Sequence, residues 1–461
     1  MMSSLEQAAQ AACACGSGRV YRECCGLPSA VAAPAPPIPF AASALPFASS
    51  GYVGSQNSFE QSVLDLLRRG NLPQADMLLR RQLAREGENA ATLNCLGWVA
   101  AAAGLAAVAC RLFARASALQ PEWQLPRANL EALAPLLSEP PSATGERFLL
   151  IKAWGFGFWS DVTHVLGNVL LAFLSGRRPV VHWGDNSLFA DGSGGNAFES
   201  YFEPLSEARF AKLSEAGEIW PPKWNRRNLP VGEVQKWHGP YSRVAAMHLL
   251  ARSEAVAVAD FHVSVLELLP YIPAESPLRG LGIDDLYLQL AQASLRPKAS
   301  ILAHVEAIRA TKLPGPYLAV HVRGSDKVLE NPALAAVNAQ YPDAIEAARV
   351  RFGVRRIFLM TDDAGIRDAY QDRYGSDLFC TDCQRTRTSE GVHYQSGRDR
   401  RRLGEEVLID ALIAAKASAF IGNGSSNASA MVKYLKAWAP GTLQLLGPQM
   451  LHAPNPVLHL W

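Results

Sequence analysis

Long apolar segments are missing from this sequence, since the longest mostly apolar stretch, around Val165–Leu174, is too short to span a bilayer. The chain also lacks an excess of one charge, because 44 Lys and Arg residues offset 42 Asp and Glu for a net charge of +2. Phosphate-backbone binding normally needs a concentrated basic face, so a nucleic-acid-binding protein is disfavoured. The first residues, MMSSLEQAAQ, show no basic segment followed by an apolar one. We therefore expect no secretory signal, no membrane span and a cytoplasmic protein.

The sequence has enough length and apolar content for several packed domains. At about 100–200 residues per domain, 461 residues predict two to four domains. Hydrophobic residues make up 49% of the chain, which is too many for a disordered protein.

Cysteine is scarce except near the N-terminus, where CACGSGRVYRECCG carries two pairs of thiols separated by Gly16 and Gly18. Zinc prefers four soft ligands in a tetrahedron, so we expect a structural zinc knuckle; a redox-reactive cluster is the alternative. The segment 13–26 resembles the SEC-C zinc-binding motif. The four expected ligands are Cys13, Cys15, Cys24 and Cys25. Cys380 and Cys383 lack a second pair nearby and are interpreted as structural thiols.

A helical segment is predicted at 56–138, after a Pro- and Ala-rich tether at 27–55. Small and large residues from Leu96 to Pro121 resemble a tetratricopeptide repeat, with Gly97 allowing close approach and Phe113 filling the gap between two helices. A weaker second repeat precedes it. Two repeats are fewer than the three or so needed for independent stability, so we expect them to pack on the next domain. Either a partner-docking surface or a helical spacer fits this pattern.

From residue 147 the chain alternates short apolar strands with helices, in two successive units at 147–310 and 311–461. FLLIKAW and PVVHW are expected strands of the first unit, and YLAVHVRG, RIFLMTDD and AFIGN of the second. This pattern predicts two parallel sheets covered by helices, facing each other across a cleft. Ligands bind at the carboxyl ends of the strands in such folds.

Polar residues gather at three strand ends of the second unit. His321 and Arg323 lie on one face where the first strand ends, and a guanidinium there can bind a diphosphate with two parallel hydrogen bonds. Asp362 and Asp363 follow the next strand, where either can also cap a helix. Residues 422–427, GNGSSN, join a strand to a helix and offer hydroxyls and backbone N–H groups to an anion. Together they predict a nucleoside-diphosphate site.

Residues 149–435 resemble the α-1,6-fucosyltransferases and the wider protein O-fucosyltransferase group. The resemblance rests on the order of GFG at 155–157, residues 196–207, LRP at 295–297, HVRGSDK at 321–327, TDD at 361–363, Asp410 and GNGSSNASA at 422–430. It implies a GT-B fold, an α/β pair of facing Rossmann-type domains. It also implies metal-independent, inverting transfer of fucose from GDP-fucose to a protein or glycan hydroxyl.

The resemblance also implies roles for individual residues. Arg323 is expected to hold the β-phosphate, and Glu330 or Asp326 to activate the acceptor hydroxyl, because Glu330 lies one residue nearer the HVRGSDK run than the family's glutamate. The remaining donor-binding residues are expected to be Gly155, Gly157, His321, Lys327, Asp362, Asp363, Asp410, Ser425, Ser426 and Asn427. The alternatives are an enzyme of the same fold that uses another nucleotide sugar, and a non-catalytic adaptor with a decayed transferase domain.

Overall fold

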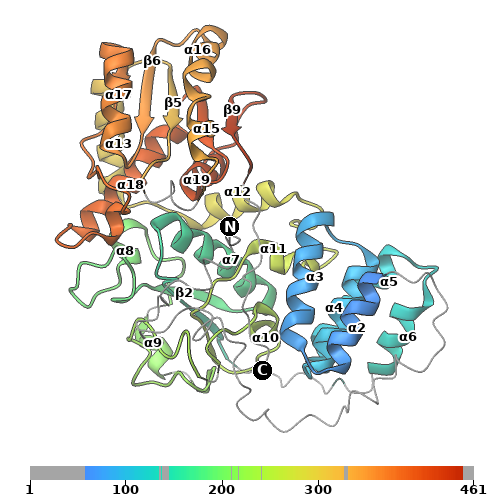
Figure 1. The fold of residues 1–461 in the computed structure, drawn as a ribbon. Coiled ribbons are helices and arrows are strands. Elements are labelled where there is room, and N and C mark those ends of the chain that lie inside the picture. Colours follow the sequence, from blue (N-terminus) through green and yellow to red (C-terminus); the bar gives the residue numbers. More distant parts are fainter. Residues whose placement is uncertain are drawn as a thin grey trace, which may run out of the picture.

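Three parts follow one another in the computed structural model: a helical segment and two α/β halves (Figure 1). The structure describes residues 58–133, 137, 145–208, 210–215, 217–239, 241–325 and 331–449. The expected zinc knuckle at 13–26 and the tether at 27–55 lie outside these ranges. In Figure 1 the helical segment, in blue, lies beside the first half, in green, and the second half, in orange to red, lies above.

The helical segment consists of antiparallel neighbours joined by short turns. Its helices are α2 (Ser58–Arg68), α3 (Leu72–Glu86), α4 (Ala90–Ala102), α5 (Ala106–Leu119) and α6 (Gln124–Leu133). The Asn89 side chain caps α4 by accepting the Thr92 N–H at 2.8 Å. A Cβ on Gly97 would lie 2.4 Å from the Phe113 ring, so the predicted close packing of α4 on α5 is confirmed. Membership of the tetratricopeptide family stays a prediction.

Ion pairs, one cluster of them buried, attach the helical segment to the first half. Arg80 of α3 lies 2.6 Å from Asp76 of the same helix and 2.6 Å from Glu267 of α11 (Val265–Leu268), and all three side chains are buried. Arg279 of the first half also pairs with Glu88, at 2.6 Å, where both side chains are half-buried. Removing one partner from a buried pair leaves an uncompensated charge, so this contact is specific. The expectation that the helices pack on the next domain is confirmed.

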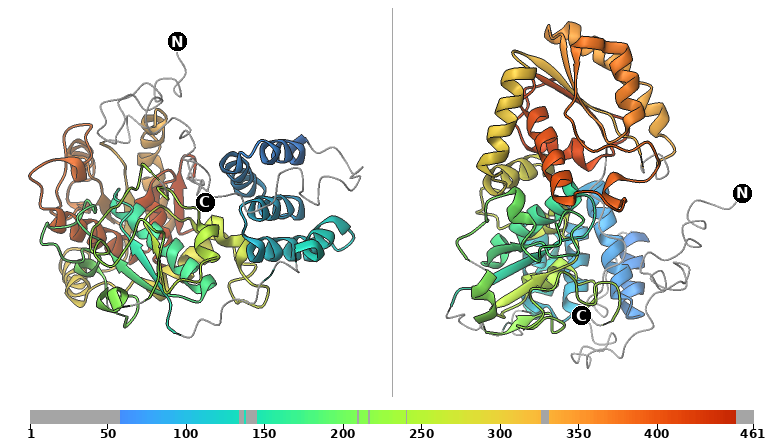
Figure 2. Two further views of the ribbon diagram at one scale, coloured as in Figure 1. Left: turned by 90° about the horizontal axis from the view of Figure 1, so that it is seen from below. Right: turned by 90° about the vertical axis from the view of Figure 1, so that its left-hand side faces the viewer.

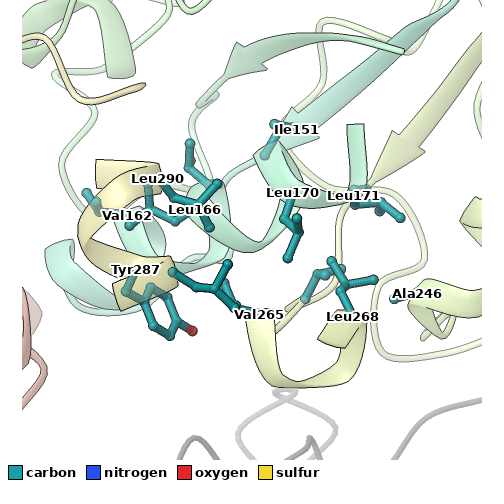
Figure 3. Packing of buried hydrophobic residues seen from close by; sticks show 14 of the residues in the cluster. Ile151, Val162, Leu166, Leu170, Leu171, Ala246, Val265, Leu268, Tyr287 and Leu290 are labelled. Carbon is teal, nitrogen blue, oxygen red and sulfur yellow. The ribbon is translucent and has the colours of Figure 1, made fainter. Parts of the chain in front are cut away.

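The first half is built on a four-stranded parallel sheet in the order β2-β1-β4-β3. Its strands are β1 (Phe148–Lys152), β2 (Arg178–His182), β3 (Ile219–Trp220) and β4 (Val256–Ala259). Its helices are α7 (Phe158–Ser175), α8 (Phe198–Tyr201), α9 (Phe210–Glu215), α10 (Ala246–Leu250), α11, the short 3-10 helix η4 (Leu269–Tyr271) and α12 (Ile283–Ser294). Leu166 and Leu170 of α7 belong to one buried cluster with Val265 and Leu290, which fastens α7 to α11 and α12 (Figure 3).

The second half carries a five-stranded parallel sheet in the order β7-β6-β5-β8-β9. Its strands are β5 (Tyr317–His321), β6 (Arg356–Met360), β7 (Leu378–Phe379), β8 (Ala419–Asn423) and β9 (Leu443–Leu446). Its helices are α13 (Ala299–Lys312), α15 (Leu334–Asn338), α16 (Tyr341–Phe352), α17 (Ala364–Tyr374), η5 (Gly375–Asp377), η6 (Val392–Tyr394), α18 (Arg400–Ala415) and α19 (Asn427–Tyr434). The expected α/β architecture with two parallel sheets is confirmed.

The two halves lie against each other; in the right-hand view of Figure 2 the second half, in orange to red, lies above the first half, in green. The rings of Tyr287 in α12 and Tyr434 in α19 stack with their centroids 4.8 Å apart. Tyr201 of α8 packs on Gly404 of α18, where a Cβ would lie 2.5 Å from the tyrosine ring.

Each sheet has a central pair of strands that are not consecutive in sequence, β1 with β4 and β5 with β8. Connections leave such a pair in opposite directions, which opens a crevice at the carboxyl ends of the two strands where ligands bind. Among the described helices, none combines the length and the apolar character that crossing a bilayer requires.

Candidate functional site

A cavity of about 500 Å³ lies between the two halves, at the carboxyl ends of their central strands. From the first half, residues that follow β1 and begin α7 line it: Trp154 and Phe156–Ser160. From the second half, the wall includes His321, Arg323, Asp362, Gln384, Asp410, Ser426 and Asn427. Residues that the sequence singled out on three strand ends are therefore brought together at one cavity.

Arg323 reaches the cavity two residues beyond the end of β5. Its guanidinium pairs with the carboxylate of Asp362, to which the Ser325 hydroxyl also donates at 2.5 Å. The Asn338 side chain donates to the Arg323 carbonyl at 2.9 Å, which fixes the backbone behind the guanidinium. A permanently charged fork held at a cavity wall is suited to the oxygens of a diphosphate.

His321 is the last residue of β5 and is almost completely buried. Its Nδ1 lies 2.7 Å from the hydroxyl of Ser429, and Tyr341 donates to its carbonyl at 2.6 Å. Burial and then the charge of Arg323 lower the pKa of His321 to about 3. The imidazole is therefore neutral at physiological pH, and it lines the cavity as a polar, uncharged group.

The N-terminus of α19 points its first residues at the cavity. Ser426 is the N-cap residue, and Asn427 and Ala428 of the first turn line the wall. Ser425 instead turns toward β8, where its N–H and hydroxyl donate to the Asn423 side chain at 2.9 and 2.7 Å. Ser425 is not part of the cavity wall, whereas Ser426 is. The backbone N–H groups of a helix N-terminus favour an anion there.

Asp410 of α18 supplies a buried carboxyl group to the same cavity. Thr381 donates to its Oδ1 at 2.6 Å. Burial raises the pKa of Asp410 to about 7, although the Thr381 hydroxyl and the charge of Arg385 act in the opposite direction. A carboxyl group with this pKa is costly to bury, so a ligand with N–H donors that favours its ionised form would repay part of the cost.

Asp362 and Asp363 are adjacent but differ in position. Asp362 lines the cavity and pairs with Arg323. Asp363 is the N-cap residue of α17 and accepts the Ile366 N–H at 3.0 Å. The expectation that one of the two caps a helix is confirmed, and Asp363 is not part of the cavity wall.

The glycine loop of the first half is organised by Asp161, which the sequence analysis missed. Gly155, with φ +85°, and Phe156 donate their N–H groups to Asp161 Oδ1 at 2.9 and 3.3 Å. Burial raises the pKa of Asp161 to about 7 against the effect of these hydrogen bonds. Gly157 is the N-cap residue of α7 and lines the cavity, whereas Gly155 lies behind the wall. A carboxylate inside the apolar run of α7 was the signal that predicts such a role.

Aromatic rings form the rest of the first-half wall. The Trp154 ring lies 4.8 Å from Phe156 and 5.7 Å from Trp237, measured between centroids. Lys236, which is buried, lies 4.7 Å from the Trp154 ring centre and donates to the Trp154 carbonyl. Lys236 thus makes a cation–π contact with the indole and a hydrogen bond to the backbone of the same residue.

Comparisons with known proteins find likeness only among solved structures: the chain matches no family model and no curated protein. It is similar to the fucosyltransferase NodZ from Bradyrhizobium, with 19% identity, 63% of this chain and 93% of that chain covered, and a TM-score of 0.41. It is also similar to POFUT1 in complex with GDP-fucose, with 15% identity, 67% and 99% coverage, and a TM-score of 0.41. Because these TM-scores lie below 0.5, the site is interpreted from its own geometry.

Three candidate residues beyond the HVRG run, Asp326, Lys327 and Glu330, lie outside the described residues, as do the four N-terminal cysteines. Their predicted roles therefore stay predictions. Within the described ranges, His, Cys, Asp and Glu side chains form no group of three or more that is arranged to hold a metal ion.

Proposed function

We propose that this protein is an inverting, metal-independent glycosyltransferase that transfers fucose from GDP-fucose to a hydroxyl of a protein or a glycan. One observation carries the proposal. A guanidinium, a neutral imidazole and a helix N-terminus meet at the β5–β8 crevice, in a cavity whose wall also holds the buried carboxyl group of Asp410. Groups suited to a diphosphate and a group suited to a nucleobase therefore share one cavity.

The diphosphate end of the site is argued from charge. Arg323 brings a permanent positive charge, and α19 brings the partial positive charge of its N-terminus, to the same wall. As the sugar leaves, negative charge accumulates on the β-phosphate oxygen. Donors that are already in place stabilise that charge without reorganising, which favours the transition state over the bound donor.

The part of the site expected to bind the nucleobase favours guanine over uracil. Guanine presents two adjacent N–H donors, on N1 and N2, and an ionised carboxylate can accept both. Uracil presents a single N–H flanked by two carbonyls, which an ionised carboxylate would repel. Asp410, with one oxygen already accepting from Thr381, fits a ligand that offers donors.

The transfer itself needs a base for the acceptor hydroxyl. In a single displacement, the acceptor oxygen bonds to the anomeric carbon while the bond from that carbon to the β-phosphate oxygen breaks, which inverts the configuration. The hydroxyl proton passes to a carboxylate, a step typically worth about 10²–10⁴-fold in rate. Glu330 and Asp326 remain the two candidates for this base.

A nucleotide screen tests the proposal and its two alternatives. Thermal unfolding would be followed with GDP, UDP, GDP-fucose and UDP-N-acetylglucosamine at equal concentrations. The proposal predicts that GDP and GDP-fucose raise the unfolding temperature most, because they bind only the folded state. Stabilisation by UDP compounds alone favours another nucleotide sugar, and no stabilisation by any nucleotide favours the adaptor.

We also propose that Cys13, Cys15, Cys24 and Cys25 bind one structural zinc ion in a cytoplasmic protein, and that the helical segment helps to recruit a polypeptide acceptor. The spacing of the thiols supports the first part. Elemental analysis of the purified protein is expected to find about one zinc per chain, and none in a variant with Cys13→Ser and Cys24→Ser. Zinc-free wild-type protein would contradict this assignment.

A further inference from the structure

A buried serine joins the two central strands of the second sheet at the candidate site. Ser429, in the first turn of α19, has no exposed surface. Its hydroxyl accepts the N–H of Asn423, the last residue of β8, at 2.9 Å. The same oxygen lies 2.7 Å from Nδ1 of His321, the last residue of β5. The hydroxyl therefore spans the crevice where strand order reverses, which is where a ligand is expected.

The space for this hydroxyl is provided by a glycine. A Cβ on Gly422 would lie 2.7 Å from the Ser429 oxygen and 2.6 Å from the Phe420 ring. Because real Cβ atoms do not approach so closely, any larger residue at 422 would displace the serine or the ring. Gly422 therefore packs directly against the Ser429 hydroxyl.

Counting protons decides the direction of the hydrogen bond. A serine hydroxyl has one proton to donate, and its oxygen already accepts the Asn423 N–H. Among the described residues, His321 Nδ1 is the acceptor that this proton reaches. The neutral imidazole has one proton of its own, so with Nδ1 accepting, that proton is on Nε2.

We infer that Ser429 is a positioning residue: it holds His321 in the tautomer with the proton on Nε2, so that this nitrogen donates to the diphosphate of the ligand. The inference rests on the proposed function for the identity of that ligand. His321 lines the cavity, and its Nδ1 is engaged by Ser429, which leaves Nε2 for the ligand. The other tautomer would direct a lone pair at phosphate oxygens and weaken binding. Ser429 thus provides the site with a neutral donor beside the cationic Arg323.

The tautomer can be measured directly in the nucleotide-free protein. Histidine labelled with ¹⁵N reports which ring nitrogen carries the proton, and comparison with a His321→Gln variant assigns the His321 signals among the 10 histidines. We expect the wild type to show Nε2–H alone and Ser429→Ala to show a mixture of tautomers. Protonated Nδ1 in the wild type, or an unchanged signal in Ser429→Ala, would overturn the inference.

The consequence for binding is measured by calorimetry with GDP. Ser429→Ala is expected to bind GDP about three- to tenfold more weakly. In a mixture of tautomers, only some of the His321 rings carry the Nε2–H that donates to the charged diphosphate. Ser294→Ala, which removes another buried serine hydroxyl in α12, is the matched control and is expected to bind GDP like the wild type. If Ser429→Ala does not fold, Ser429→Cys replaces the hydroxyl by a weak donor of similar size.

The two measurements separate the inference from the proposed function. A tautomer shift with unchanged GDP affinity contradicts a role of Ser429 in diphosphate binding. A wild-type protein that binds no nucleotide contradicts the proposed function, whatever the tautomer of His321. A tautomer shift together with weaker GDP binding supports both.

Discussion

Trp154 and Arg323 occupy equivalent positions in the two halves. Trp154 lies two residues beyond the end of β1 and Arg323 lies two residues beyond the end of β5, and both line the cavity. Both strands are central in a parallel sheet and both precede the crevice. The first half directs its charges inward: Lys152, which ends β1, is buried and donates to the Leu229 carbonyl. The second half directs its charges to the cavity. Equivalent positions in the two halves therefore have different roles: the first half forms an aromatic wall of the cavity, and the second half supplies the groups suited to a diphosphate.

The charges behind the first-half wall support this division. Lys223, which follows β3, and Asp260, which follows β4, form a buried ion pair. Lys236 lies under Trp154, and burial lowers its pKa. These groups stabilise loops and do not line the cavity. Substitutions in the second half are therefore expected to affect chemistry and binding, and substitutions in the first half to affect the shape of the site.

The largest effect is expected for Arg323→Ala, which removes the positive charge of the guanidinium from the candidate diphosphate site. Transfer and donor hydrolysis should fall by about 100- to 1,000-fold or more in kcat/KM, as for other preorganised donors to a developing negative charge. The fold should persist, since Arg323 lies at the cavity edge and not in the apolar core. Initial rates and circular dichroism check both points. Arg323→Lys keeps the charge without the fork and should be intermediate; wild-type turnover in Arg323→Ala would remove the basis of the proposal.

Asp410→Asn is expected to have the next largest effect, about 10- to 100-fold on GDP affinity. Asparagine still accepts from Thr381 but presents an NH₂ group in place of an acceptor. Asp399→Asn is the matched control, because Asp399 caps the same helix and asparagine also caps. Calorimetry with GDP measures the loss. Equal GDP affinities of the wild type and Asp410→Asn would show that the guanine of GDP does not bind at Asp410.

The pKa of Asp410 also predicts a pH dependence. Because protonation removes an acceptor, wild-type GDP affinity should fall as the pH drops below about 7, and Asp410→Asn should retain only the slope from the phosphate itself. For stability the sign is opposite. The pKa of Asp410 in the folded state, about 7, exceeds the ordinary value of 3.8. Between these two pH values folding takes up a proton, so the contribution of Asp410 to the free energy of unfolding declines as the pH rises from 3.8 to 7. Unfolding temperatures measured at pH 5 and pH 8 should show that Asp410→Asn becomes more stable relative to the wild type at the higher pH.

A smaller effect, about tenfold in KM, is expected for Asp161→Ala in the first half. The variant leaves the N–H groups of Gly155 and Phe156 without their acceptor, so the loop that carries Gly157 shifts. Asp161→Asn keeps an acceptor oxygen and should stay within about threefold of the wild type. Steady-state kinetics distinguish the two. A loss as large in Asp161→Asn as in Asp161→Ala would mean that the charge of Asp161, and not its hydrogen bonds, matters to the site.

The smallest effect is expected for Trp154→Phe, about three- to tenfold in kcat/KM. Phenylalanine keeps an aromatic wall but fills less of it and loses part of the contact with Lys236. If Trp154→Phe were as damaging as Arg323→Ala, the two halves would not differ as described, and the first-half wall would take part in the chemistry.

Sequence patterns predicted β1, β2, β5, β6 and β8, the parallel sheets and part of the second-half wall, because apolar strands and polar strand ends leave local signals. His321 and Arg323 were found in this way, Asp410 was found through the family resemblance, and all three lie at one cavity. The short strands β3, β4, β7 and β9 were missed, since two to four residues are too few to show a strand pattern.

Asp161 and Ser429 were missed for different reasons. A lone carboxyl group inside an apolar helix is costly to bury, and this holds for Asp161 in α7 as it does for Asp410 in α18. Ser429 lies within the GNGSSNASA run, but its role depends on the contact with His321, 108 residues earlier in the chain. Pairings between distant strand ends are decided by the register of β5 on β8, which no local pattern encodes.

The central claim is that the second half grips a nucleoside diphosphate while the first half shapes the cavity around it, and a crystal structure with bound GDP tests it most directly. We expect phosphate oxygens within hydrogen-bonding distance of Arg323, of His321 Nε2 and of the N–H groups that begin α19, with guanine against Asp410. GDP bound elsewhere, or with its phosphates held by the first-half lysines, would contradict the claim.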